Sequence, residues 1–72
     1  MTCAIKLFDV VALTQDLPDE GLVRGQVGTV VEQYDADAYE VEFCDDNGQT
    51  YALATVQPEQ VMVLCFRPTA AA

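Results

Sequence analysis

The sequence predicts an all-β fold, a small barrel of five antiparallel strands. Residues 38–43 alternate, with Tyr39, Val41 and Phe43 on one side and Glu40 and Glu42 on the other, which is the pattern of a half-buried strand. Asn47-Gly48 stands between two strand patterns, and this dipeptide is the strongest short-range signal for a β-hairpin. No stretch of the chain has convincing helical periodicity.

The stretch Arg24–Glu32 runs from a tight turn directly into a strand. Gly25 can adopt a positive φ at the turn without a Cβ clash. Gly28 interrupts a run of β-branched residues, and a glycine there indicates a bulge, a bend or a close backbone approach. A strand that bends at a glycine would allow a very small barrel to close on itself.

The first strand is expected at residues 8–13, which are apolar on both faces and therefore central or covered on both sides. Residues 14–23 contain proline, glycine and three acids without any period, and they predict a long loop. Leu17 and Leu22 are the expected anchors of this loop. The second strand is expected over about Val27 to Tyr34.

A turn at residues 35–37 precedes the alternating strand, and Cys44 falls on its outward, acidic side. The hairpin turn is expected at Asp45–Gly48, because both Asn47 and Gly48 tolerate a positive φ. The returning strand, residues 49–56, would then direct Tyr51 and Leu53 into the core. Residues 58–60 fit a single 3₁₀ turn, residues 61–66 form the last strand, and residues 67–72 are expected to be a frayed tail.

Five strands, a long first loop, short hairpins and a 3₁₀ turn before the last strand together resemble an SH3-like barrel. The 72 residues make a single domain, with an ordered core expected over about residues 5–66. The side chains expected in the core are Val10, Val30, Val41, Phe43, Leu53 and Val63.

The chain is strongly acidic, with 12 acidic and 3 basic residues and a net charge of −9. This charge repels the phosphate backbone of nucleic acids and anionic membrane surfaces. Two interpretations of the acidity remain open. It provides solubility, or it steers the protein toward a basic partner.

The chain has no histidine, and Cys3, Cys44 and Cys65 are widely spaced. This composition argues against the usual zinc sites and against Cys–His and Ser–His–Asp systems, so we expect no metal or cofactor. No apolar run is long enough to span a membrane, and the first residues do not form a signal peptide. We therefore expect three reduced thiols and a cytoplasmic location.

Gly25-x-x-Gly28-x-Val30 resembles the core of a KOW motif, which occurs in SH3-like barrels of ribosomal and transcription proteins. KOW proteins that bind RNA carry basic and aromatic residues around this motif. Here the neighbouring residues are mostly acidic, with Arg24 the only base among them. This difference argues against binding of nucleic acid.

A second resemblance covers about Leu7 to Leu64, where the chain is similar to a family of short bacterial proteins classed as a domain of unknown function. The resemblance implies an SH3-like fold and brings no activity with it. The segments that carry it are residues 8–13, Asp16-Leu17-Pro18, Gly21-Leu22, residues 24–31, residues 39–43 and Gly48-x-Thr50.

Catalysis needs a positioned acid, base or nucleophile, and the carboxylates here fall on predicted turns and outward faces, so we expect no enzyme. The sequence predicts a small acidic protein-interaction module or an accessory, regulatory subunit. The alternative is an acidic antitoxin or immunity-type inhibitor of a basic partner enzyme. The candidate partner-binding residues are Tyr34, Glu40, Glu42, Met62 and Phe66.

A homodimer is a further expectation, because the first and last strands are apolar on both faces while a small barrel buries only one. Val11, Leu13, Met62, Leu64 and Phe66 cannot all lie inside by simple alternation. Tyr39 and Tyr51 are expected to pack in the core. In a monomer, the loop at residues 14–23 and the tail would have to cover the remaining apolar side chains.

Overall fold

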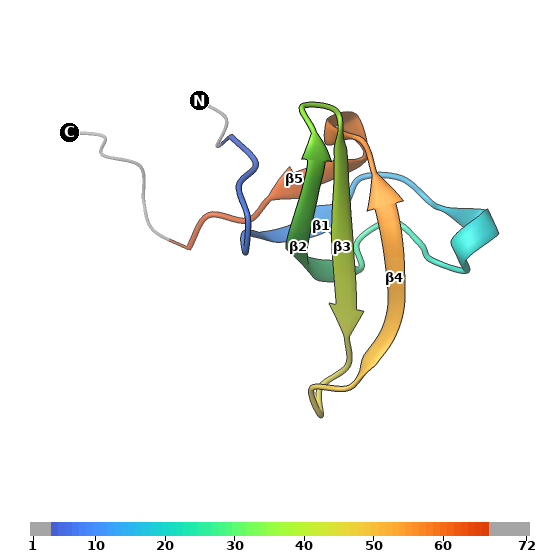
Figure 1. Cartoon of the computed structure of the whole chain (residues 1–72). Coiled ribbons are helices and arrows are strands. Elements are labelled where there is room, and N and C mark those ends of the chain that lie inside the picture. The colour runs from blue at the N-terminus through green and yellow to red at the C-terminus, as the bar shows by residue number, and fades with distance from the viewer. Residues whose placement is uncertain (1–3, 67–72) are drawn as a thin grey trace.

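The computed structural model describes residues 4–66 as an all-β protein with five strands and two 3₁₀ turns (Figure 1). All strand pairs are antiparallel, and the order across the sheet is β4-β3-β2-β1-β5. In chain order the elements are β1 (Val10–Leu13), η1 (Pro18–Glu20), β2 (Val27–Asp35), β3 (Ala38–Cys44), β4 (Thr50–Val56), η2 (Pro58–Gln60) and β5 (Val61–Val63).

The sheet is strongly bent but open. In Figure 1, β2, β3 and β4 stand side by side at the front, while β1 and β5 run across behind them. β2 pairs with both β1 and β3, so it joins the two parts. β4 and β5 are the two edges and do not pair with each other. The expected closed barrel is therefore not confirmed.

The core lies on the concave side of this bend, and Val30, Val41 and Phe43 are buried in it as predicted. Val63 is half-buried and packs against it. The full set of buried apolar residues is Val11, Leu13, Leu22, Val30, Tyr39, Val41, Phe43, Ala54, Val56 and Val61.

Leu53 was expected in the core, and this prediction is wrong, because its side chain is 53% exposed. The register explains the difference. Leu53 lies opposite Glu42, and directly opposite residues share a face of the sheet, so Leu53 points outward. Ala54, opposite Val41, takes the inward position. Tyr51 is also exposed and meets only the rim of the core, where its ring lies 6.3 Å from the ring of Phe43.

The first strand is shorter than predicted and buries its other face. Val11 is buried, and Val10, which was expected in the core, lies on the outward face. The strand begins at Val10 because Lys6–Asp9 form a turn, in which the Asp9 amide donates to the Lys6 carbonyl at 3.1 Å. The last strand is also shorter than expected and ends at Val63. The predicted tail, residues 67–72, lies outside the described residues.

The hairpin between β3 and β4 is confirmed, with Gly48 in its turn. Gly48 has φ 81°, whereas Phe8 is the one non-glycine residue with positive φ among the described residues, so Asn47 does not adopt it. The Asp45 amide donates to the Gln49 carbonyl and the Gly48 amide to the Asp45 carbonyl. This is the three-residue loop with a glycine in the left-handed region. It places Asp45 opposite Gln49, in register with Cys44 opposite Thr50, so the shift between Phe43 and Cys44 is a separate bulge at Tyr51.

The long loop before β2 is anchored as predicted. Leu22 is buried, and Leu17 is half-buried and packs against the core. The two residues form an isolated antiparallel bridge, in which each amide donates to the other's carbonyl. The 3₁₀ turn η1 occupies the tip between them, and η2 lies at the predicted residues before β5.

Gly28 lies where another backbone comes close, as the sequence indicates. A Cβ atom added there would lie 2.5 Å from Val41 Cγ1, 2.8 Å from the carbonyl oxygen of Glu42 and 3.0 Å from Phe43 Cδ2. The carbonyl oxygen belongs to the backbone of the neighbouring strand and cannot rotate away. Glycine is therefore the residue that lets β2 pass this close to the inward side chains of β3.

We expect Gly28→Val to destabilise the protein by about 3 kcal/mol, because overpacking a buried position forces the backbone to shift. Chemical denaturation measures this. Thr29→Val is the matched control, since Thr29 is the next residue of β2 and lies opposite Val10 on the outward face. Equal stability of the two variants would contradict the close approach.

Candidate partner-binding surface

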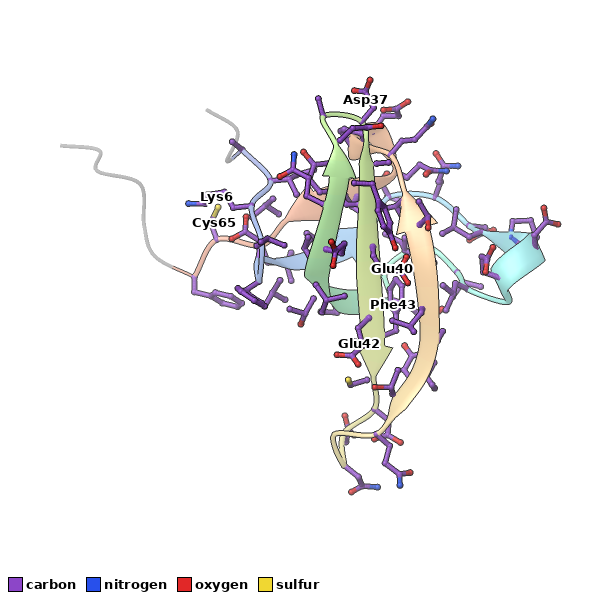
Figure 2. The ribbon with its side chains drawn as sticks, in the orientation of Figure 1. Lys6, Asp37, Glu40, Glu42, Phe43 and Cys65 are labelled. Atoms are coloured by element: carbon purple, nitrogen blue, oxygen red, sulfur yellow. The ribbon has the colours of Figure 1, made fainter. Side chains whose placement is uncertain are left out.

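Two carboxylates on β3, those of Glu40 and Glu42, are held on the outward face of the sheet by hydroxyl groups (Figure 2). The Thr55 hydroxyl donates to Glu40 Oε1 at 3.1 Å. The Thr50 hydroxyl donates to Glu42 Oε2 at 2.8 Å. Both threonines belong to β4, so both carboxylates lean from β3 across the neighbouring strand.

Tyr34 holds Glu40 from the side of β2. Its hydroxyl donates to Glu40 Oε1 at 3.3 Å, while its ring is 58% exposed. The register shifts in β2 at Val30/Glu32 and again at Gln33/Asp35. These irregularities place Glu32 directly opposite Glu40, and like charges in that arrangement are destabilising. We name Glu32, Tyr34, Glu40 and Glu42 the acidic face.

The acidic face raises the pKa of the Tyr34 phenol above its ordinary value of 10.0. Partial desolvation is the first cause, followed by the charge and hydrogen bond of Glu40 and the charge of Glu32. The phenol therefore stays protonated at neutral pH and keeps donating to Glu40. Since the pKa is raised in the folded state, this contribution to stability is present below pH 10.0 and is lost as the pH rises through the raised pKa.

The described bases do not hold these carboxylates. Lys6 precedes β1 and Arg24 precedes β2. Figure 2 shows Lys6 away from both labelled glutamates. The side-chain partners of Glu40 and Glu42 are neutral hydroxyl groups, so the negative charge of the face remains available to a partner.

A second surface lies on the outward side of the other part of the sheet and carries no charge. Ala12 lies between Val27 on β2 and Met62 on β5. The next row places Val10 beside Leu64, whose amide donates to the Val10 carbonyl at 2.9 Å. Met62 is 55% exposed. We name Val10, Ala12, Val27, Met62 and Leu64 the β1–β5 face.

The five predicted site residues therefore do not form one site. Tyr34, Glu40 and Glu42 come together in the acidic face, and Met62 lies on the separate β1–β5 face. Phe66 follows β5 and is 79% exposed. The expectation that Glu40 and Glu42 share an outward face is confirmed.

Phe8 is a feature that the sequence prediction missed. It has φ 70° at the third position of the Lys6–Asp9 turn, where glycine is preferred, and its side chain is 72% exposed. The left-handed conformation costs a bulky residue about 1–2 kcal/mol. Its amide donates to the Val30 carbonyl at 2.6 Å, which holds it against β2, two residues before Val10. No pattern in the sequence signals this, because a phenylalanine is not expected at a glycine position.

Thr50, Thr55 and Glu32 were also missed as members of this surface. Thr55 lies directly opposite Glu40 across the β3–β4 pair. Continued pairing from the turn would place Ala54 opposite Glu40, and it is the register shift between Phe43 and Cys44 that brings Thr55 there instead. The bulges that place Glu32 opposite Glu40 have no signal in the sequence.

The cysteines differ from the prediction of three reduced thiols. Cys44 is free and exposed on the outward side, as expected. Cys65 is disulfide-bonded, so the prediction is wrong for this residue. Cys3 lies outside the described residues.

Residues 4–66 contain no helix that is long and apolar enough to cross a membrane. The family model described as Domain of unknown function (DUF4926) matches residues 7–63. The chain belongs to this family. No curated protein and no solved structure matches the chain.

We expect Glu40→Gln to lower the pKa of Tyr34 toward its ordinary value, because the substitution removes the charge that opposes ionisation of the phenol. An NMR titration of the tyrosine ring carbons measures this. Glu42→Gln is the control, since Glu42 accepts from Thr50 and has no hydrogen bond with Tyr34. An unchanged Tyr34 pKa in Glu40→Gln would contradict the described contact.

Proposed function

We propose that the protein is a non-enzymatic interaction module, an accessory or regulatory subunit that binds a basic protein partner through its acidic face. The observation that carries the proposal is that Glu40 and Glu42 are fixed by hydroxyl groups while their charge is left uncompensated. A net charge of −9 adds a long-range attraction toward a basic protein.

The opposition of Glu32 and Glu40 supports a role in binding. A sheet gains nothing from two carboxylates placed directly opposite each other, and solubility would be served equally well by acids on turns. A cationic side chain placed between them would remove the repulsion. This arrangement supports electrostatic recognition over solubility as the role of these residues.

An acidic antitoxin or immunity-type inhibitor is the narrower alternative, in which the basic partner is an enzyme that the module blocks. The same charge supports it. A nuclease-like or toxin-like gene beside this one favours the inhibitor, and a metabolic enzyme gene favours the accessory subunit.

We also propose that the sheet is SH3-like. The support is the long loop anchored by Leu17 and Leu22, the two hairpins, and the 3₁₀ turn directly before β5. The cytoplasmic location stays a prediction, and the disulfide at Cys65 is an observation against it, because disulfides are rare in the cytosol.

The interaction is tested by affinity capture from the native cell, comparing the wild type with a Glu40→Gln/Glu42→Gln variant. We expect the wild type to capture a basic protein at low salt and the variant to lose it. Asp19→Asn/Glu20→Gln is the matched control, because it removes the same charge from η1. Equal loss in both variants would show that only net charge matters, and equal capture in all three would refute the role of the acidic face.

We further propose a homodimer through the β1–β5 face. The five residues of this face carry no charge, so two copies can meet there without opposing carboxylates. Phe8 supports the proposal, because its strained turn holds an exposed aromatic ring two residues before Val10. A two-fold axis would bring the same face of each copy together.

Light scattering at micromolar concentration tests the dimer. We expect a dimer mass for the wild type and a monomer mass for Met62→Lys, because a lysine in an apolar contact must be desolvated. Leu53→Lys is the control, since Leu53 has nearly the same exposure on the other part of the sheet. A monomer mass for the wild type would rule out the proposal.

A further inference from the structure

β4 is an edge strand of the sheet, and its length and composition are unusual for an edge strand. It is seven residues long, and one of its sides pairs with β3. Protein edges that must stay unpaired are usually short, charged or interrupted by proline. The residues of β4 are Thr50, Tyr51, Ala52, Leu53, Ala54, Thr55 and Val56, none of which is charged or proline.

The hydrogen bonds of β2 identify the backbone groups that face this open edge. Val30 uses its amide and carbonyl toward β1, bonding the Asp9 carbonyl and the Phe8 amide. Successive residues of an antiparallel strand direct their backbone groups to opposite sides. The backbone groups of Glu42 therefore point toward β2, and those of Val41 point toward β4. Val41 lies opposite Ala54.

The same alternation carries through to β4. Since Ala54 bonds to Val41, the amides and carbonyls of Leu53 and Thr55 point away from β3, toward solvent. Neither residue's backbone bonds to a turn or loop among the described residues. The edge therefore presents a row of free donors and acceptors.

The acidic face lies within reach of this edge. Thr55 pairs with Glu40 and donates to its carboxylate, which draws that charge over β4. A strand added beside β4 would lie about 10 Å from β3, two strand spacings away. Its residue opposite Thr55 would share the outward face with Glu40, and a lysine or arginine there is long enough to meet the leaning carboxylate.

We propose that the edge of β4 binds an extended basic segment of the partner protein, which adds as a sixth antiparallel strand. This inference rests on the proposed function and names the form of the partner. The segment alternates basic residues, which lie over the outward face toward Glu40 and Glu42, with apolar residues on the other face. Backbone hydrogen bonds to Leu53 and Thr55 give affinity, and the carboxylates give specificity.

A second copy of the chain fits this edge less well. Pairing β4 with itself would bring two carboxylates that lean over β4 toward the same two carboxylates of the other copy, each chain carrying a charge of −9. A basic segment reverses the sign of that interaction. Charge complementarity therefore selects the partner segment for β4.

The test uses a synthetic alternating Lys-Val peptide that spans β4, with binding followed by fluorescence anisotropy. One version is N-methylated at its lysines and a second at the same number of valines, so the charge is equal in both. The peptide residues whose side chains lie over the outward face are the same residues whose backbone groups bond to Leu53 and Thr55. Methylation at the lysines should weaken binding by about tenfold or more through the lost hydrogen bonds, while methylation at the valines should change it by less than about twofold.

Each remaining outcome is informative. Equal weakening by both methylations, together with loss of binding in Glu40→Gln/Glu42→Gln, would overturn strand addition and leave the acidic face as the binding surface. Absence of binding at low salt would overturn the proposed edge, while the capture experiment still decides the proposed function. A dimer joined through β4 in the protein alone would show that a second copy occupies the edge, which also overturns the proposal.

Discussion

The close approach of Gly28 to β3 is the constraint on which the rest of this structure depends. β2 is the strand that pairs with both β1 and β3, and at Gly28 its backbone passes so near Val41 and the Glu42 carbonyl that a Cβ atom has no room. The two parts of the sheet meet there around one core. β4 and β5 remain the two edges of the sheet.

The distribution of charge follows from that arrangement. The outward side of the sheet is acidic where β2, β3 and β4 run together and apolar where β1 and β5 lie. Thr29 marks the boundary, because it lies opposite Val10 on one side and Glu42 on the other. One continuous face therefore carries two surfaces of different chemistry, and the two proposed interactions would use separate places on it.

The five strands along the chain, the hairpin and the long loop could be predicted from the sequence, because alternation at residues 38–43, the Asn47-Gly48 turn and the Leu17/Leu22 pair are local signals. The sequence could not predict which side chains of β4 point into the core. One extra residue near the turn, accommodated by the shift between Phe43 and Cys44, reverses which side chains point inward, and so Ala54 lies inside and Leu53 outside. The position of Glu32 opposite Glu40 depends on bulges in β2 that carry no sequence signature.

The direction of the β4 backbone is the central claim, and native-state amide hydrogen exchange in the free protein tests it most directly. The account predicts slow exchange at Ala54 and Val56, whose amides bond to β3, and exchange near the rate of an open chain at Leu53 and Thr55. Slow exchange at Leu53 and Thr55 in the monomer, with fast exchange at Ala54, would contradict the account.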